Sequence, residues 1–312
     1  MAFDTNCLEI IFSGDDHYAR HMGAAVHSLL TNNTEFDKIR IHVIDNHIAP
    51  ENIKRLEDTV GQFANASLIR IPFDPWRDKL KLDPVWPISL SSYARLFVAQ
   101  MLPETIGRVL YLDSDMIICG SLRPLWETDL GDCVVGAVQD YVGDRTKIAV
   151  GLSPDEAYFN AGLLLIDMDK WREQQIEAAC LSFIEAHNGS VAHHDQGVLN
   201  GVLHDRRMLL PVRYNLMTIH YLFNRRKLTR YFNDHADFYG ETEMEKALDA
   251  PVILHFTPSF TSRPWVKTCR HPKKQAYWDS LGNTPWRGTR PEPDKTKWYI
   301  RLINWRYRCL PY

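Results

Sequence analysis

The sequence predicts an α/β fold in which a mostly parallel, nucleotide-binding sheet is flanked by helices. Over the first part of the chain, apolar runs typical of strands alternate with amphipathic runs typical of helices, and this alternation indicates a parallel sheet covered on both faces. The first apolar run ends on small and acidic residues, at the place where such sheets bind ligands. A later apolar run, RVLYLDSDMI at 108–117, ends on two aspartates.

The composition narrows the class of protein. The chain has 312 residues, of which 45% are hydrophobic, enough for one large domain with an appendage or for two small domains. No run approaches the roughly 20 apolar residues that cross a bilayer, and no N-terminal signal peptide is visible, so we expect a cytoplasmic protein. Six scattered cysteines without a CxxC pair favour free thiols over disulfides. The net charge of −3 argues against a general nucleic-acid binder.

The first elements form a strand, helix, strand series. Residues 8–16 read as a buried strand, and a helix follows because apolar and small residues recur at helical spacing from His21 to Leu29. No GxGxxG motif follows the strand, so the usual dinucleotide fingerprint is missing. Two further strands are predicted at 38–45 and 66–72, and Pro50 opens the helix between them.

The next segment leads to the acidic strand. Residues 72–90 are rich in Pro, Trp and Asp and are predicted to form an irregular surface loop, and residues 91–102 a helix with Arg95 in its first turns. This arginine is either an exposed charge or a guanidinium that holds clustered acids in place.

The strand at 108–117 carries the main candidate site. In an extended chain, residues two apart point to the same side, so Asp113 and Asp115 are predicted to converge on one hard cation while Ser114 faces away. Mg²⁺ or Mn²⁺ is the first choice, because these ions take carboxylates together with substrate phosphate oxygens. The alternative is that the two acids only form a turn or cap a helix.

The second half continues the same pattern. Strands are predicted at 132–140 and 158–168, the latter with a small-residue step at 160–162 that lets a ligand approach the backbone. Residues 170–187 are predicted to form one amphipathic helix. The helix at 193–203 has Asp195 and Gln196 in its first turn. The helix dipole stabilises an acid at this place, which explains Asp195 but not Gln196. The strand at 251–257 brings His255 to its end, and this histidine is structural unless acids elsewhere need a third partner.

Six motifs occur in a characteristic order. They are SGDDHY, SSYARL, YLDSDM, YFNAGLLLI, HHDQGVLNG and ILHF. Together, over roughly residues 8–265, the chain resembles the family-8 retaining glycosyltransferases, especially the bacterial enzymes that transfer α-galactose or α-glucose to lipopolysaccharide and lipooligosaccharide. The resemblance implies a GT-A fold whose DxD motif holds Mn²⁺ against the diphosphate of a UDP-sugar.

The resemblance also implies individual roles. Asp113 and Asp115 match the DxD acids, and His255 matches the histidine that completes the metal site. Asp15 matches the residue that contacts uracil, and His17 stands where the galactosyltransferases have asparagine. The implied donor-binding positions are Ser13, Asp15, His17, Arg95, Asp113, Ser114, Asp140, Asn160 and Arg263. Asp195 and Gln196 match positions near the reacting carbon, and we expect them to be catalytic.

The chain departs from the family pattern after His255. The family often has a short HxxGxxKPW arrangement, whereas this chain has the longer HFTPSFTSRPW, without the glycine and with Arg263 in place of lysine. A guanidinium still neutralises a diphosphate, but its fork differs in geometry from a point-charge ammonium.

The resemblance predicts a metal-dependent retaining hexosyltransferase. It moves galactose or glucose from UDP-galactose or UDP-glucose to a glycan acceptor, namely lipopolysaccharide or another lipid-linked surface glycan, by attack on the face from which UDP leaves. Two alternatives stay open: a glycogenin-like enzyme that glycosylates a protein or itself, and a protein on this fold that binds sugar nucleotides without catalysis.

The C-terminal run KTKWYIRLINWRYRCLPY forms a second informative stretch. At helical spacing Trp298, Leu302, Trp305 and Cys309 share one face, beside a basic stripe formed by Lys297, Arg301 and Arg308. This helix either packs its aromatic residues on the domain or lies on anionic lipid. We predict the second, with residues 295–309 attaching the protein to the cytoplasmic face of the inner membrane. The chain then divides into a catalytic domain at 1–265 and a membrane-associating segment at 266–312.

Overall fold

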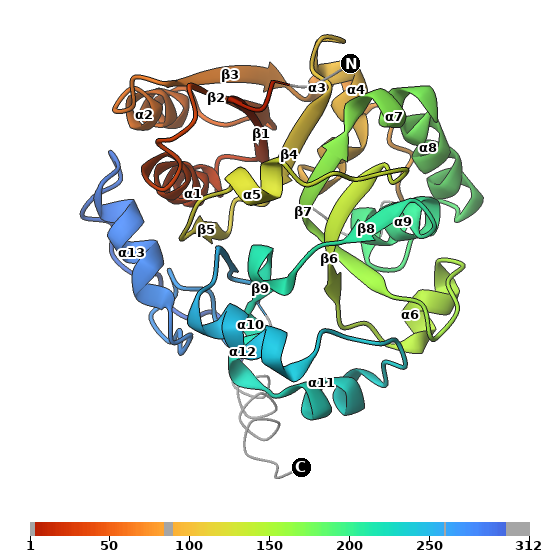
Figure 1. Ribbon diagram of the computed structural model, residues 1–312. Coiled ribbons are helices and arrows are strands. Elements are labelled where there is room, and N and C mark those ends of the chain that lie inside the picture. Colours follow the sequence, from red (N-terminus) through yellow and green to blue (C-terminus); the bar gives the residue numbers. More distant parts are fainter. Residues whose placement is uncertain (1–3, 84–89, 259, 298–312) are drawn as a thin grey trace.

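The computed structural model describes residues 4–83, 90–258 and 260–297. A seven-stranded sheet of order β3-β2-β1-β4-β7-β6-β8 forms its centre (Figure 1), and β7 is the strand that runs antiparallel to its neighbours. The strands are β1 (Cys7–Gly14), β2 (Lys38–Asp45), β3 (Ala66–Pro72), β4 (Arg108–Leu112), β6 (Val135–Asp140), β7 (Tyr158–Asp167) and β8 (Arg207–Leu209). The predicted mostly parallel α/β sheet is confirmed.

Helices cover both faces of this sheet. In Figure 1, α1 (Ala19–Thr31) and α2 (Pro50–Val60) lie on one side, and α7 (Met168–Glu173), α8 (Ile176–Ala186) and α9 (His194–Leu203) lie on the other. Two hydrophobic cores result, and successive residues of β1 enter them in turn. Ile10 and Phe12 pack in the core that contains α1 and α2, whereas Ile11 packs in the core that contains α8 and α9. A strand buried on both faces therefore carries apolar residues at successive positions, as Ile10, Ile11 and Phe12 of β1 do.

A small second sheet brings distant segments together. It consists of β5 (Met116–Ile118), β9 (Leu216–Met217) and β10 (Ile253–His255), with β10 in the centre. His255 pairs with Met116 on one side and with Met217 on the other. This pairing places a residue from late in the chain directly beside the acidic segment that precedes Met116.

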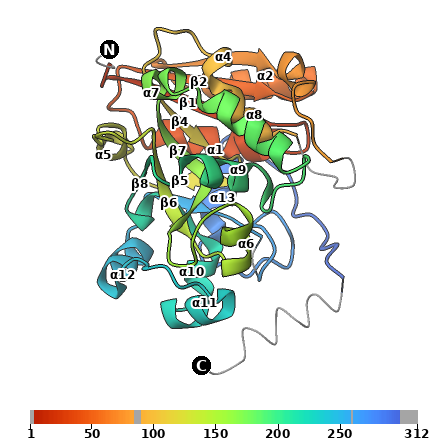
Figure 2. The same ribbon diagram turned by 90° about the vertical axis from the view of Figure 1, so that its right-hand side faces the viewer.

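The remaining helices connect and close the sheets. They are α3 (Asp74–Arg77), a 3₁₀ helix (Ser92–Phe97), α4 (Val98–Met101), α5 (Arg123–Trp126), α6 (Asp144–Ala149), a 3₁₀ turn (Val212–Tyr214), α10 (Thr218–Leu222), α11 (Arg225–Phe232), α12 (Glu241–Asp249) and α13 (Lys274–Gly282). Figures 1 and 2 both place α10, α11 and α12 together at one end of the molecule.

Some predicted elements differ from the observed ones. The single helix predicted at 170–187 is wrong: α7 ends before Gln174, and α8 begins after Gln175, whose φ of 51° is left-handed. A left-handed residue cannot continue a right-handed helix, so the chain changes direction there. The loop predicted at 72–90 contains the short helix α3. The helix predicted at 91–102 begins as a 3₁₀ helix.

The segment after residue 265 packs partly on the sheet domain. The hydroxyl of Tyr277 on α13 lies 2.8 Å from Nδ1 of His21 on α1, and Oγ of Ser280 donates a hydrogen bond of 2.6 Å to the carbonyl of Ala24. Trp286 fills the space over Gly23, where an added Cβ would lie 2.4 Å from the indole ring. The predicted membrane-binding residues from Trp298 to the end lie outside the described residues. Within the described ranges, no helix is long and apolar enough to cross a bilayer.

Candidate active site

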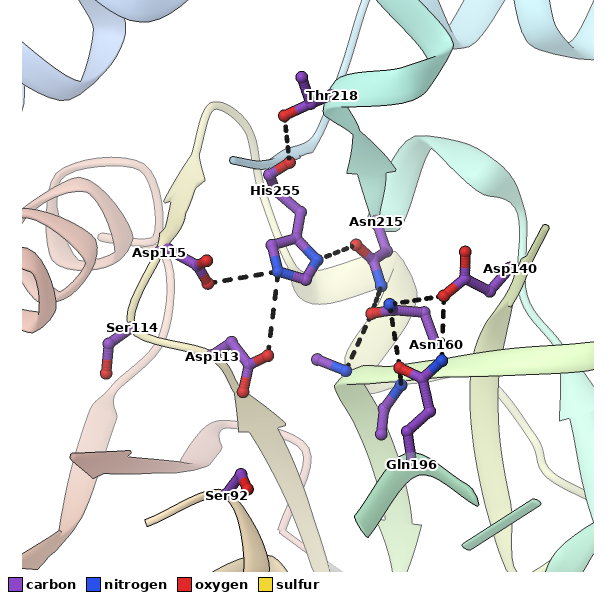
Figure 3. Close-up of polar contacts among 12 residues, drawn as sticks. Ser92, Asp113, Ser114, Asp115, Asp140, Asn160, Gln196, Asn215, Thr218 and His255 are labelled. Atoms are coloured by element: carbon purple, nitrogen blue, oxygen red, sulfur yellow. Dashed lines mark hydrogen bonds and ion pairs between the residues drawn. The ribbon is translucent and has the colours of Figure 1, made fainter. Parts of the chain in front are cut away.

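The acidic motif lies in a turn at the end of the central strand β4. Its strand ends at Leu112, the backbone N–H of Asp113 donates to the carbonyl of Gly162 at 2.8 Å, and the chain then turns before β5. The extended conformation predicted for 113–115 is therefore not observed. The two carboxylates still face a common space, while Ser114 points away from it (Figure 3) and donates from Oγ to the carbonyl of Ser13 at 3.2 Å.

His255 completes a cluster with the two aspartates. Its Nε2 atom lies 3.2 Å from Oδ1 of Asp115 and 3.8 Å from Oδ2 of Asp113. One ligand atom from each of the three residues lies within 4.8 Å of the others. Two carboxylates and one imidazole nitrogen are suitable ligands for Mn²⁺, so these residues fit a divalent ion.

The cluster has the electrostatics of a cation site. Burial lowers the pKa of His255, but the carboxylates of Asp115 and Asp113 outweigh this effect and raise the pKa above its ordinary value. Burial also raises the pKa of Asp113, against the lowering effect of Arg95. The carboxylates of Asp113 and Asp115 thus place negative charge beside His255, and a divalent cation would complement this charge.

A chain of amides orients His255. Its Nδ1 atom lies 2.9 Å from Oδ1 of Asn215, so Nδ1 carries the hydrogen and Nε2 faces the acids. Figure 3 shows how the chain continues: Asn215 donates to Oδ1 of Asn160 at 2.9 Å, and Asn160 donates to Oδ2 of Asp140 at 3.0 Å. Gln196 closes the network, because it donates to Asp140 at 3.0 Å and accepts from Asn160 at 3.2 Å.

Gly162 makes the close approach of these side chains possible. A Cβ atom at this position would lie 2.6 Å from Cε1 of His255 and 2.8 Å from Oδ2 of Asp113. The small-residue step at 160–162 was predicted to admit a ligand to the backbone. In the structure it admits the side chains of the cluster itself.

Arg95 forms ion pairs with two acids of the site, Asp113 and Asp195. It is only 3% exposed, which contradicts the interpretation of an exposed charge. Its Nη2 lies 2.8 Å from Oδ1 of Asp113, and its Nε lies 3.1 Å from Oδ2 of Asp195. It also donates to the carbonyl of Ala161, and its guanidinium lies 4.3 Å from the ring centroid of Tyr111. Burial lowers the pKa of Arg95, but the carboxylates of Asp113 and Asp195 outweigh this effect and raise it.

A cleft opens beside the cluster at the carboxyl ends of β1 and β4. Its walls include six of the predicted donor-binding residues, namely Ser13, Asp15, Arg95, Asp113, Ser114 and Arg263. The other residues that line it are Gly14, Tyr18, Ser91, Ser92, Tyr111 and Asp115. Parallel α/β sheets bind nucleotides at this edge. The position of the cleft therefore agrees with the site predicted from the sequence.

Arg263 places a cation in the wall of this cleft. Its Nη2 atom lies 3.1 Å from Oδ2 of Asp115, and its guanidinium lies 5.5 Å from the ring centroids of both Tyr18 and Trp265. Burial lowers its pKa to about 10, so it is charged at neutral pH. The substitution of arginine for the family's lysine thus places a guanidinium against two aromatic rings.

Not every predicted residue reaches the cleft. Asp140, Asn160 and Gln196 lie beside it in the amide network, and Asp195 contacts it through Arg95. His17 is exposed and does not line the cleft among the described residues; its backbone N–H donates to Asp15. The predicted contact of His17 with the nucleoside has no support in this geometry.

Sequence reasoning missed several residues of the site. Asn215 is fully buried, and the sequence around it, PVRYNLMTIH at 211–220, gave no signal for it. Tyr18, Ser91 and Tyr111 line the cleft; they lie inside the motifs SGDDHY, SSYARL and YLDSDM, but no role was assigned to them. Their contribution depends on the way the strands meet, which the sequence does not display.

The fold and the site define a glycosyltransferase. Residues 9–269 match Glycosyl transferase family 8, and the chain belongs to this family. It is 28% identical to general stress protein A of Bacillus subtilis, over 89% of this chain and 94% of that protein. It is 27% identical to lipopolysaccharide 1,2-glucosyltransferase of Escherichia coli K12, over 94% of this chain and 82% of that enzyme.

Solved structures agree with this assignment. The galactosyltransferase LgtC, crystallised in complex with donor and acceptor sugar analogs, superimposes with a TM-score of 0.71 and 27% sequence identity. The match covers 91% of this chain and 98% of that chain. The GT-A fold expected from the resemblance is thereby confirmed.

Proposed function

We propose that this glycosyltransferase is a metal-dependent, retaining hexosyltransferase that moves galactose or glucose from a UDP-sugar to a glycan acceptor. The observation that carries the proposal is the cluster of Asp113, Asp115 and His255, whose ligand atoms lie within 4.8 Å of one another at the cleft beside β1. The relatives support the substrate classes, since one is a lipopolysaccharide glucosyltransferase and one a galactosyltransferase solved with sugar analogs.

Each residue of the site has a role in this proposal. Asp113, Asp115 and His255 hold a Mn²⁺ or Mg²⁺ ion, which when bound supplies Lewis-acid stabilisation of the departing diphosphate. Arg263 adds a positive charge on the same side of the cleft. Ser13 and Asp15, at the carboxyl end of β1, are the proposed contacts with the nucleoside.

Retention of the anomeric configuration requires either a covalent intermediate on a carboxylate or attack on the face from which UDP leaves. Gln196 is a poor nucleophile, and its amide bonds to Asn160 and Asp140. Asp195 is buried and paired with Arg95 at 3.1 Å, which suits it to positioning. We therefore favour same-face attack, with the leaving phosphate taking the proton of the acceptor. Detection of a glycosyl adduct on Asp195 by mass spectrometry would overturn this mechanism.

The activity is tested with the full chain, Mn²⁺, and either UDP-galactose or UDP-glucose. We expect slow UDP release without acceptor, faster release with a lipopolysaccharide core glycan, and loss of both in Asp115→Asn. The matched control is Asp205→Asn, whose side chain is 60% exposed and lies outside the cleft lining. A mass increase of the enzyme itself would favour the glycogenin-like alternative. Donor binding without any UDP release would favour the alternative of a protein that binds sugar nucleotides without catalysis.

We also propose that residues 295–309 attach the enzyme to anionic lipid on the cytoplasmic face of the inner membrane, where a lipid-linked acceptor is found. The support is compositional: the run carries tryptophans, tyrosines and basic residues, and each basic charge contributes about 1 kcal/mol near such a surface. The test compares co-sedimentation of the full chain and of a chain truncated after Pro293 with vesicles that contain phosphatidylserine. Equal co-sedimentation of the two would contradict the proposal.

A further inference from the structure

We propose that the outer face of α11 contacts the headgroups of anionic lipids and forms a membrane-binding surface on the folded domain. This face consists of Arg226, Lys227, Arg230 and Tyr231, and we call it the α11 face. The inference deepens the proposed function, on which it rests for the nature of the acceptor, a lipid-linked glycan. It adds a surface of the described fold to the membrane contact proposed for residues 295–309.

The spacing of these residues places them on one side of the helix. Arg226 and Arg230 are four residues apart, as are Lys227 and Tyr231, so the members of each pair are neighbours on the helix surface. Leu228, which is 2% exposed, lies on the opposite side and packs inward. Arg226 and Arg230 are exposed, and Tyr231 is 44% exposed. The helix therefore presents a basic outer face to its surroundings.

The charge of this helix has one sign. α11 contains four basic residues and no acidic one, whereas the surface of a soluble domain usually mixes both signs. Glu241 and Glu245 of α12 line a cavity together with Arg225 and Arg226, and they offset part of that positive charge, but Lys227 and Arg230 do not line this cavity. The α11 face therefore keeps a net positive charge, which an anionic lipid leaflet attracts.

Aromatic rings border the basic residues. The ring centroid of Phe260 lies 4.8 Å from that of Phe223 and 5.0 Å from that of Tyr231. Nζ of Lys227 lies 4.8 Å from the ring centroid of Phe223. Basic residues beside aromatic ones are typical of helices that lie at a membrane surface, and tyrosine is enriched at the depth of the headgroups. A soluble polyanion uses only the charges, so the rings favour a lipid surface.

The position of α11 leaves it accessible to a flat surface. Figures 1 and 2 both place it at one end of the molecule, farther from the central sheet than α10, while α2 lies toward the opposite end. A helix at an end of the molecule meets a membrane without interference from the central sheet.

The α11 face is connected to the donor cleft and to the predicted lipid-binding run. Phe260 precedes Arg263, a residue of the cleft wall, by three positions, so their Cα atoms lie within about 11 Å of each other. Farther along this segment, Oγ1 of Thr268 donates to Oδ2 of Asp294 at 2.5 Å, and the predicted run begins at the next residue, 295. A membrane at the α11 face therefore lies near both, as a lipid-linked acceptor requires.

The first test locates the contact on the full chain. Hydroxyl-radical footprinting with mass spectrometry measures the oxidation of Tyr231 alone, with phosphatidylcholine vesicles, and with vesicles that also contain phosphatidylserine. We expect the phosphatidylserine vesicles to reduce the oxidation of Tyr231 several-fold and phosphatidylcholine vesicles to leave it unchanged. Ile69 on β3 is the internal control, because it is 39% exposed and its oxidation should not change.

The second test uses charge reversal. The double variant Arg226→Glu, Arg230→Glu should bind phosphatidylserine vesicles about tenfold more weakly than the wild type or less tightly still, because two attractive charges become repulsive. The matched control is Lys54→Glu, Arg55→Glu on α2, which changes the charge equally at two exposed positions away from the α11 face. Its effect should be small, since salt screens charges beyond about 10 Å.

Three outcomes would overturn the inference: unchanged oxidation of Tyr231 with phosphatidylserine vesicles, equal effects of the two double variants, or stronger protection of Tyr231 by soluble polyphosphate than by the vesicles. Asp115→Asn separates the inference from the proposed function, because it should bind vesicles as the wild type does. If vesicles protect Tyr231 but the wild-type chain releases no UDP from any UDP-sugar, the proposed activity fails while the lipid-binding surface stands.

Discussion

The Nδ1 atom of His255 lies 2.9 Å from the side-chain oxygen of Asn215, and this bond directs the other ring nitrogen at Asp113 and Asp115. Asn215 therefore acts on the metal site through the tautomer and the orientation of the imidazole. Loss of such a partner typically lowers metal affinity about 10- to 100-fold.

The first prediction concerns this bond. Asn215→Ala should weaken Mn²⁺ binding about 10-fold or more, measured by calorimetric titration, because the ring of His255 is no longer held. Asn33→Ala is the matched control: Asn33 is also fully buried and makes two hydrogen bonds, to Leu29 and Leu122, outside the cluster. Equal loss of affinity in both variants would show that Asn215 has only a general role in stability.

The second prediction concerns Gly162. An alanine Cβ there would lie 2.6 Å from His255 and 2.8 Å from Asp113, so Gly162→Ala should push two cluster residues apart and abolish detectable Mn²⁺ binding. Gly282→Ala, on α13, provides the comparison because no atom lies within 4 Å of the added Cβ. Mn²⁺ binding by the two variants is measured from the paramagnetic broadening of water protons by free Mn²⁺. Unchanged binding in Gly162→Ala would contradict the observed approach of these side chains.

The third prediction concerns Arg95. Arg95→Met leaves the half-buried carboxylate of Asp113 and the buried carboxylate of Asp195 without their cation, and should lower the free energy of unfolding by about 3–5 kcal/mol in urea titrations. Addition of Asp195→Asn to this variant should recover part of the loss. Arg206→Met, which breaks a pair with an exposed Asp205, should change stability by less than about 1 kcal/mol. A cost equally small for Arg95→Met would refute the role given to this side chain.

The fourth prediction concerns pH. Burial raises the pKa of Glu177 to about 6 from an ordinary value of 4.5, so the folded protein binds this proton more tightly than the unfolded chain. Its contribution to stability is present below pH 4.5 and is lost as the pH rises through 6. Glu177→Gln should therefore be more stable than the wild type by about 1 kcal/mol near pH 8.

That difference should vanish near pH 4, where the wild-type carboxyl is protonated in both states. Glu185→Gln on the same helix is the control for the change of residue type, since its side chain is 71% exposed. A pH-independent effect of Glu177→Gln would mean that the carboxyl of Glu177 does not titrate as proposed.

The order of strands and helices was predictable because burial on both faces gives strands such as β1 a central run of successive apolar residues, Ile10 to Phe12. The break between α7 and α8 was not, because the 170–187 run keeps helical periodicity and only the left-handed backbone of Gln175 interrupts it.

The sequence predicted that the residues of the metal cluster lie together, but the structure brings them together in a different way from the one we predicted. The argument from the extended chain placed Asp113 and Asp115 on one side, whereas in the structure a turn brings them together and the pairing of β10 with β5 brings His255 beside them. The resemblance supplied His255, but neither the resemblance nor the pattern pointed to Asn215. The region that contains α10, α11 and α12 had no prediction, although α11 and α12 are amphipathic, because it carries no motif.

The central claim is that Asp113, Asp115 and His255 bind a divalent ion and through it a UDP diphosphate. Calorimetric titration of UDP into the full chain tests it most directly, with Mn²⁺ present or with EDTA, in the wild type and in Asp115→Asn. The account predicts UDP binding in the wild type with Mn²⁺, and its loss both with EDTA and in the variant. UDP binding of equal affinity under all these conditions would contradict it.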